Sequence, residues 1–177
     1  AKPIDYSKPT FIQPKLDGVR CVIQYEGKSS VDPRVVAYSR TGKQWKNIEH
    51  ICMQLKPFFK KYPDVILDGE LYNHDLRNDF EQIISIVRRQ KPDDIDMLNS
   101  REMVQFHCYD AIDELVKFNN RHLWLTKFVP ESYCVKHVKT QAVPTESLSK
   151  VVHQQNLDAG YEGSILRLNT EYQCKRS

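Results

Sequence analysis

The irregular order of strand-like and helix-like segments is the feature that most constrains how this chain folds. Segments rich in β-branched and aromatic residues, typical of strands, cover 10–25, 35–39, 65–72, 104–109, 133–138 and 164–168. Apolar residues recur at helical spacing in three places: 48–59 behind a cap at Asn47, 80–87 behind Asp79 with Gln82 completing a capping box, and Ser147–Asp158. Because strands and helices do not alternate regularly, the sequence predicts an α+β fold with mainly antiparallel β-sheets flanked by helices.

Length and composition are those of an ordinary folded domain. The chain has 177 residues, of which 40% are apolar and 28% charged, so we expect one domain with one sizeable core. The apolar runs are far shorter than the ~20 residues that span a bilayer, which predicts a soluble, intracellular protein with no membrane partner. A formal net charge of +3 permits a phosphate-rich partner but does not require one.

The cysteines give no sign of zinc or redox chemistry. They are an odd number, widely spaced and without a CxxC pair: Cys21, Cys52, Cys108, Cys134 and Cys174. The pattern therefore predicts buried, reduced thiols.

The segment Lys15-Leu16-Asp17-Gly18-Val19-Arg20 places a lysine at a predicted strand end, beside an Asp-Gly turn. A lysine amine attacks only when it is deprotonated, and a nearby cation or desolvation promotes that form. Arg20 is such a cation, and its guanidinium also suits phosphate or ribose oxygens. A lysine and a turn at a strand edge are also common in proteins without this chemistry, and Asp17 is compatible with a simple turn former.

Three carboxylates lie beside glycines in predicted strands. Asp68 and Glu70 flank Gly69, and Glu162 precedes Gly163. Carboxylate oxygens are the ligands that Mg²⁺ prefers, and several of them reaching one cleft from separate strands would suit phosphate transfer. Taken singly, each carboxylate is better explained as a turn cap or an exposed strand residue.

Two further segments supply groups that could bind a nucleotide. Arg40 stands at a strand end between hydroxyl residues, which suits a phosphate contact, although an exposed strand-end arginine is equally compatible. Tyr109, with Phe106 in reserve, could stack on a base, although aromatic residues in such strands more often belong to the core.

In order and spacing these segments resemble the nucleotidyltransferase superfamily of DNA ligases, RNA ligases and mRNA capping enzymes. The chain is most similar to an ATP-dependent DNA ligase, and the matching segments are 15–20, 39–42, 68–70, 109–110 and 162–167. The resemblance implies a nucleotidyltransferase domain over residues 1–177, with sheets and helices forming a nucleotide-binding cleft. It also implies a monomeric enzyme whose partners are ATP and nicked double-stranded DNA.

The resemblance implies a reaction in which Lys15 attacks the α-phosphate of ATP, forming lysyl-AMP and releasing pyrophosphate. The AMP then passes to the 5′-phosphate of a DNA nick, and the 3′-hydroxyl displaces it to seal the strand. In these terms Arg20 and Glu70 hold the ribose. Glu162 binds the catalytic metal, Mg²⁺ or Mn²⁺.

The other roles also come from the resemblance. Arg40 grips the 5′-phosphate of the nick and Tyr109 stacks on adenine. Gln13, two residues before the nucleophile, contacts the adenine amino group. Asp17 and Asp68 support the later steps through the metal or neighbouring arginines.

The sequence departs from the family pattern near its end, where Lys175 and Arg176 stand instead of a lysine pair in a Leu-Lys-x-Lys context. We expect a domain that lacks this final lysine motif and the C-terminal OB-fold domain, and that seals nicks poorly by itself. Three alternatives stay open: an mRNA-capping guanylyltransferase, an RNA ligase, and a non-catalytic module that binds nucleotides or DNA ends.

Overall fold

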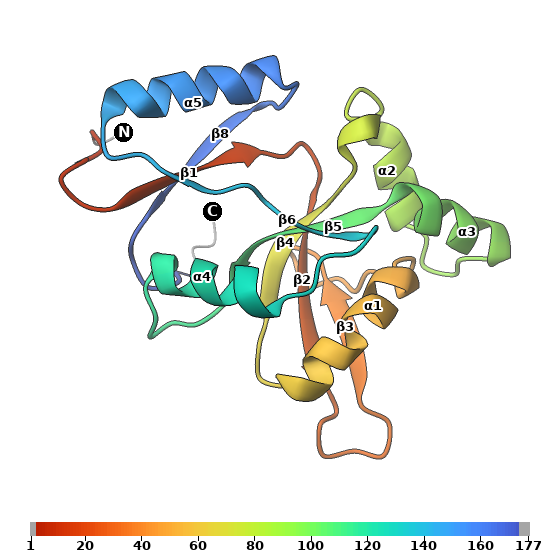
Figure 1. The fold of residues 1–177 in the computed structure, drawn as a ribbon. Helices are drawn as coiled ribbons and strands as arrows, with labels where there is room; N and C mark the ends of the chain where they lie inside the picture. The colour runs from red at the N-terminus through yellow and green to blue at the C-terminus, as the bar shows by residue number, and fades with distance from the viewer. Residues whose placement is uncertain (1–2, 174–177) are drawn as a thin grey trace.

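Two β-sheets form the centre of the molecule in the computed structural model, which describes residues 3–173 (Figure 1). The five-stranded sheet consists, in spatial order, of β3 (Arg34–Tyr38), β2 (Val19–Glu26), β4 (Leu67–Tyr72), β5 (Gln105–Ala111) and β6 (Val135–His137). The three-stranded sheet consists of β7 (Gln141–Ala142), β1 (Thr10–Lys15) and β8 (Gly163–Leu168). Of the named strand pairs, β5 with β6 is parallel and the others are antiparallel. This confirms the predicted α+β class.

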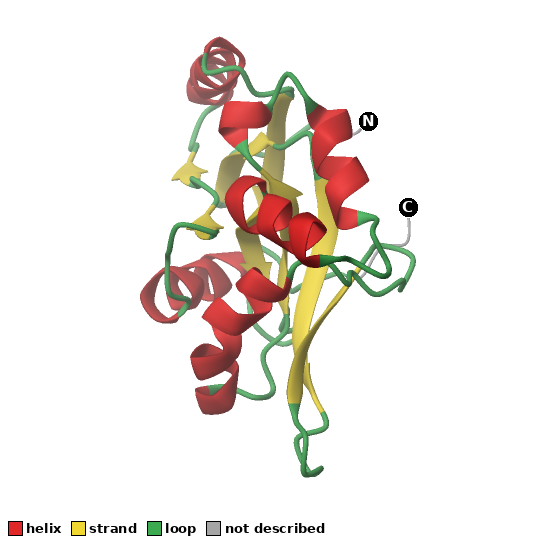
Figure 2. Cartoon of the chain, turned by 90° about the vertical axis from the view of Figure 1, so that its right-hand side faces the viewer, coloured by secondary structure: helices red, strands yellow, loops and turns green. Residues whose placement is uncertain are grey.

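Helices cover the sheets and build two separate cores (Figure 2). The helical segments are α1 (Glu49–Lys61), η1 (His74–Leu76), α2 (Phe80–Val87), α3 (Asp94–Met103), α4 (Phe118–Phe128) and α5 (Glu146–Asp158). The larger core joins the five-stranded sheet to α1, α2 and α4 through residues such as Leu55, Ile83 and Leu125. The smaller core contains Ile12 of β1 and Val152 of α5. Each sheet therefore has its own hydrophobic core.

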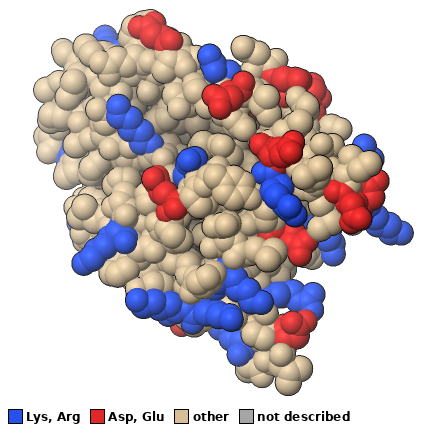
Figure 3. All heavy atoms as spheres, turned by 45° about the vertical axis from the view of Figure 1, so that its right-hand side comes forward, with Lys and Arg blue, Asp and Glu red and all other residues tan. Residues whose placement is uncertain are grey.

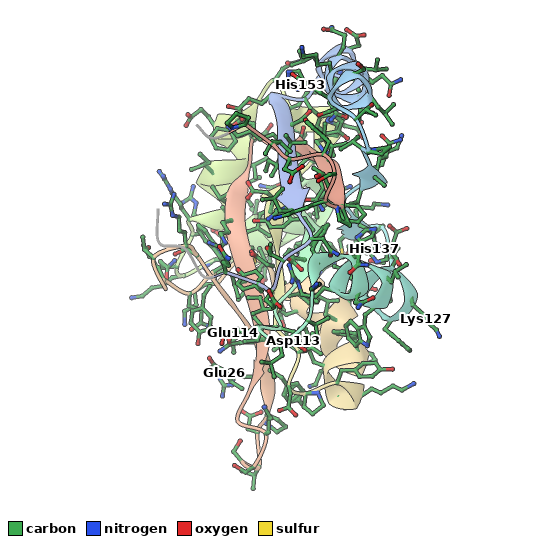
Figure 4. All side chains as sticks on the ribbon, turned by 90° about the vertical axis from the view of Figure 1, so that its left-hand side faces the viewer. Glu26, Asp113, Glu114, Lys127, His137 and His153 are labelled. Carbon is green, nitrogen blue, oxygen red and sulfur yellow. The ribbon has the colours of Figure 1, made fainter. Side chains whose placement is uncertain are left out.

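The two sheets mark opposite ends of the molecule. β2 and β3 extend as a hairpin at the bottom of Figure 1, whereas β1, β8 and α5 lie at the top. Figure 4 shows the same separation, because His153 of α5 lies at one end and Glu26 of β2 toward the other. We call the five-stranded sheet with α1 to α4 the five-stranded lobe, and the other sheet with α5 the three-stranded lobe.

The predicted helix caps were partly wrong. Ile48, not Asn47, is the N-cap of α1, and the buried Asn47 amide instead donates to the carbonyls of Ile86 and Asp96. Asp79 is the N-cap of α2 but makes no side-chain capping bond, so the capping box with Gln82 is absent there. The Asn47 side chain is thus used by tertiary contacts instead of capping.

Two helices escaped prediction because neither has a continuous apolar face. In α3 only Ser100 is buried, while Ile95 and Leu98 are exposed. In α4 the buried face includes the charged Arg121, which interrupts the apolar periodicity. The capping box of Asp93 and Asp96, with side chains accepting from each other's backbone N–H groups, is the sequence signal that could have located α3.

The expectation of reduced thiols is confirmed for the described cysteines. Cys21, Cys108 and Cys134 are buried, Cys52 is half-buried, and all four are free. Cys174, together with Lys175 and Arg176, lies outside the described residues. Within residues 3–173 no helix has the length and apolar character needed to cross a membrane.

Candidate active site

The pairing of β1 with β8 brings Lys15 next to Glu162. Lys15 is the last residue of β1 and lies opposite Gly163, the first residue of β8. Glu162 directly precedes that strand, and its Oε1 lies 3.6 Å from Lys15 Nζ. Both side chains are about half exposed, at 51% and 49%. The amine is thus at the protein surface, held at a strand end beside one carboxylate.

The pairing of β2 with β4 places Arg20 opposite Glu70 and next to Asp68. Arg20 donates from Nε and Nη2 to the two oxygens of Asp68, at 3.0 Å each, while Asp68 is almost fully buried. The hydrogen bonds to Asp68 raise the pKa of the Arg20 guanidinium. The hydroxyl of Tyr172 accepts from Arg20 and donates to Asp68, both at 2.8 Å. Asp68 thus lies beside an arginine, and the positive charge of Arg20 is balanced by this carboxylate.

Glu70, a residue of β4, lies in a poorly hydrated position next to the turn that joins β1 to β2. Burial, and secondly the charge of Asp68, raise the pKa of Glu70 to about 8, although a backbone N–H of Gly18 donates to it and partly opposes the shift. The turn has little free space, because a Cβ at position 18 would overlap the Leu71 carbonyl oxygen and lie 3.1 Å from Glu70 Oε2. The Asp-Gly turn therefore contains glycine for steric reasons.

Replacement of Glu70 by glutamine is expected to stabilise the protein at high pH. The folded state binds a proton at Glu70 more tightly than the unfolded state does, so wild-type stability falls as pH rises from about 4.5 to about 8. Glutamine keeps the acceptor for Gly18 but cannot ionise. Urea unfolding should give equal stabilities at pH 4 and an advantage of about 1–3 kcal/mol for Glu70→Gln at pH 8.5. An equal advantage at both pH values would show that ionisation of Glu70 is not the cause.

A cleft of about 690 Å³ opens between the two sheets. Of the predicted site residues, five line it: Lys15, Arg20, Arg40, Glu70 and Tyr109. Trp45 and Ile165 line it too, and Trp45 donates from its indole N–H to the Arg20 carbonyl. Asp68 is buried behind Arg20, and Asp17 is exposed on the β1–β2 turn. The cleft thus collects groups from both sheets that could bind a base, a sugar and phosphates.

Gln13 and Arg167 hold Tyr109 at one wall of the cleft. The Gln13 amide is buried; it donates to the Tyr109 carbonyl at 3.2 Å and to Thr140 Oγ1 at 2.9 Å, and its Oε1 accepts from Arg167 Nε. The Arg167 guanidinium lies 4.9 Å from the centre of the Tyr109 ring, a cation–π contact. The prediction that Phe106 could serve in reserve for base stacking was wrong, because its side chain is fully buried in the core.

Arg40 lies in the tight turn that follows β3. The turn is closed by the Gly42 N–H, which donates to the Ser39 carbonyl at 3.0 Å, and Gly42 has φ of +87°, a conformation that favours glycine. The Ser39 and Thr41 hydroxyls are 3.2 Å apart. Arg40 and these two neighbouring residues line the cleft together.

Sequence reasoning missed the supporting residues Trp45, Tyr172 and Arg121, and assigned no role to Arg167 within the matching segment 162–167. Arg121 donates from Nε and Nη2 to both oxygens of Asp110, at 2.8 and 3.1 Å, and both side chains are buried. Tyr172 acts on Asp68, 104 positions earlier in the chain. No local sequence pattern predicts such contacts. Only Arg121, a charged residue in an otherwise amphipathic segment, could have suggested a buried acidic partner.

A preformed cage for a metal ion is absent from the described part of the chain, where no three His, Cys, Asp or Glu residues are grouped to hold one. The Glu162 carboxylate beside Lys15 remains as a charged oxygen donor, and Glu70 contributes a second carboxyl group to the cleft. Mg²⁺ typically takes one or two carboxylates and completes its coordination with substrate phosphates and water. The residues present therefore fit a divalent ion that arrives together with a phosphorylated substrate.

Comparisons with known proteins identify a family and related folds. The sequence model of the ATP dependent DNA ligase domain matches residues 4–177. A DNA ligase of African swine fever virus is 28% identical over 162 residues, which are 89% of this chain but 36% of the viral protein. The chain thus spans about a third of that relative's length.

Solved structures share the fold. A DNA ligase–adenylate structure of Chlorella virus superposes on the whole chain with a TM-score of 0.67 and 19% identity, over 61% of its own length. A structure named Pmar-Lig_PreS3 covers 96% of this chain with a TM-score of 0.71 and 22% identity, over 41% of its length. From the sequence match, which extends over nearly all of its residues, the chain belongs to the ATP-dependent DNA ligase domain family.

Proposed function

We propose that the cleft binds ATP and that Lys15 becomes covalently attached to AMP as the first step of sealing a DNA nick. Lys15 Nζ attacks the α-phosphorus, a P–N bond forms, and the bond from that phosphorus to the bridging oxygen breaks. Pyrophosphate leaves with the electron pair of the broken bond, and the amine releases a proton. The observation that carries the proposal is the convergence of Lys15, Arg20, Arg40, Glu70 and Tyr109 on one cleft.

The positions of these side chains suggest how the nucleotide is oriented. Tyr109 presents its ring to the adenine; Gln13 holds the Tyr109 backbone carbonyl, and Arg167 lies against the ring. Glu70 and Arg20, opposite each other on β4 and β2, hold the ribose. The α-phosphate then lies near Lys15 at the end of β1. This arrangement brings nucleophile and phosphorus together before reaction, which lowers the entropic part of the barrier.

Arg40 is proposed to hold the 5′-phosphate of the nick in the later steps, with Asp17 and Asp68 in support. Asp68 acts through Arg20, with which it forms the bidentate pair. On the face that Figure 3 shows, Lys and Arg side chains gather in the lower part of the surface. Such a surface favours a polyanion such as nicked duplex DNA, and we propose that the protein binds it as a monomer.

A divalent ion, Mg²⁺ or Mn²⁺, would be held by Glu162 and the phosphates, and when bound it neutralises charge that develops on phosphate oxygens.

Glu162→Gln is expected to slow Lys15 adenylylation by raising the free energy of the transition state by several kcal/mol. The charge that retains the ion is lost while the side chain keeps its shape. The measurement is the adenylylation rate over a titration of Mg²⁺ and of Mn²⁺. Glu171→Gln, an exposed carboxylate beyond β8, is the matched control. An undiminished rate for Glu162→Gln would remove this assignment.

Tyr109→Ala is expected to weaken ATP binding by about 1–3 kcal/mol, as loss of base stacking does elsewhere. Tyr109→Phe keeps the ring and should bind ATP nearly as well as the wild type. Calorimetric titration with a non-hydrolysable ATP analogue measures the difference. If Tyr109→Ala binds the analogue as tightly as the wild type does, another side chain stacks on the base, and Trp45 of the cleft is the next candidate.

The test of the proposed function is incubation of the protein with ATP or GTP labelled at the α-phosphate, followed by a denaturing gel and mass spectrometry. We expect a covalent AMP adduct on Lys15 and none from GTP. An adduct from GTP alone would favour a guanylyltransferase. Absence of an adduct with either nucleotide, together with nucleotide binding, would favour a non-catalytic module.

A further inference from the structure

A short turn after β4 reaches from the five-stranded lobe to the three-stranded lobe. Asn73 caps η1 by accepting a hydrogen bond from the Asp75 N–H at 3.0 Å, and its amide donates to the Met103 carbonyl at the end of α3, also at 3.0 Å. The backbone of His74, the first residue of η1, is therefore fixed to the five-stranded lobe.

The ring of His74 crosses to the other lobe. Its Nε2 lies 2.8 Å from the Ala159 carbonyl oxygen and its Nδ1 lies 2.7 Å from the Tyr72 hydroxyl. A carbonyl oxygen only accepts, so Nε2 carries the hydrogen, and in the neutral ring Nδ1 accepts from Tyr72. The ring also stacks on Tyr161, with centroids 4.1 Å apart and planes at 21°. One side chain thus binds the loop that enters β8 by a hydrogen bond and a stacking contact.

Arg77 packs on the same loop. Gly160 has φ of +93°, a conformation that favours glycine, and a Cβ there would lie 2.5 Å from Arg77 Nε, so the arginine packs closely on the turn. Arg77 Nη1 also donates to the His74 carbonyl at 2.8 Å. Arg77 therefore contacts both η1, through the His74 carbonyl, and the loop of Ala159–Tyr161, through Gly160.

This loop leads directly to the carboxylate beside the nucleophile. Tyr161 precedes Glu162, whose Oε1 is 3.6 Å from Lys15 Nζ, and Gly163 pairs with Lys15 across the strands. The Glu162 side chain is half exposed, so packing alone constrains it little. The position of its backbone depends on how the preceding residue is held.

We propose that His74, acting through Tyr161, is a positioning residue that holds Glu162 in place beside Lys15. The inference rests on the proposed function, since it assigns Glu162 to the adenylylation site. The part of the cleft around Tyr109 is held by contacts that do not involve His74: Gln13 of β1 donates to the Tyr109 carbonyl, and Arg167, near the far end of β8, lies over the Tyr109 ring. Loss of the His74 contact therefore loosens the Glu162 side of the cleft and leaves the side assigned to adenine intact.

The kinetic test compares His74→Ala with the wild type in single-turnover adenylylation of Lys15, titrating ATP and Mg²⁺ separately. Loss of a supporting partner behind a metal-binding carboxylate typically lowers metal affinity or activity by 10- to 100-fold. We therefore expect roughly that decrease in the adenylylation rate and a higher Mg²⁺ requirement. The KM for ATP should change by no more than about threefold. His74→Gln retains an N–H donor for the Ala159 carbonyl and should recover part of the rate, and Tyr161→Phe should retain the stacking and the rate.

His50→Ala is the matched control. His50 Nε2 also lies 2.8 Å from a backbone carbonyl oxygen, that of Val104, and its ring also stacks on a tyrosine, Tyr133, at 6.5 Å. These contacts stay within the five-stranded lobe. His50→Ala should therefore leave the Mg²⁺ requirement unchanged even if it lowers stability. Equal changes in both variants would show a general structural effect and overturn the inference.

Amide hydrogen exchange tests the inference without any reaction. His74→Ala should increase exchange in 160–164 and leave exchange in β4 and in the middle of α5 unchanged. Unchanged exchange in 160–164, or a wild-type adenylylation rate in His74→Ala, would overturn the positioning role. If the wild type forms no AMP adduct, the proposed function fails instead, and the exchange experiment still decides whether His74 holds the loop.

Discussion

Lys15→Ala is expected to abolish covalent labelling by AMP while leaving the fold intact. The substitution removes the attacking nitrogen, and the Lys15 side chain is 51% exposed at a strand end, so little packing is lost with it. Lys15→Arg should be equally inactive, because a guanidinium stays protonated and cannot attack phosphorus. Gel analysis with ATP labelled at the α-phosphate measures the adduct, and thermal unfolding checks the fold.

The matched control is Lys150→Ala, which removes an exposed lysine of α5 that pairs with Glu146. Full labelling is expected for this variant. A persisting AMP adduct in Lys15→Ala would show that another side chain is the nucleophile, and peptide mapping of that adduct would identify it. The assignment of every other residue in the cleft would then have to be revised around the new position.

Arg121→Met is expected to destabilise the protein by about 3–5 kcal/mol, because it leaves the charge of Asp110 buried and unpaired. The side chains of Arg121 and Asp110 are 6% and 2% exposed. Arg121 Nη1 also donates to the carbonyls of Val116 and Thr170, at 2.6 and 2.8 Å, and these acceptors lose their partner too. Urea unfolding measures the loss.

Two comparisons make this result interpretable. Arg34→Met breaks an exposed pair with Asp32 and should cost at most about 1 kcal/mol. The double variant Arg121→Met with Asp110→Asn removes both charges and should be more stable than Arg121→Met alone. If the single and double variants lose the same stability, the buried charge is not the cause. Asp110 follows Tyr109 directly, so this pair also anchors the strand that carries the proposed base-stacking residue.

The sequence by itself determined the class of fold and singled out the residues to which the proposed function assigns the chemistry. Runs of β-branched residues located the named strands except β7 (Gln141–Ala142), and helical periodicity located α1, α2 and α5, because both patterns arise from local burial on one face. Lys15, Glu70 and Glu162 stood out since each lies close to a glycine in or beside a predicted strand, a local arrangement visible in one dimension. The family was indicated by the order of these segments.

Tertiary structure alone decided which of these groups meet. Arg20, interpreted from the sequence as a cation for the lysine, is paired with Asp68, 48 positions away, and Asp68 also binds Tyr172. The contact of His74 with Tyr161 likewise joins distant segments. α4 was not predicted because the face it buries includes Arg121, whose partner Asp110 lies on another element. Strand register and helix docking set such contacts, and they depend on residues far apart in the chain, whereas periodicity and turn chemistry report only on neighbours.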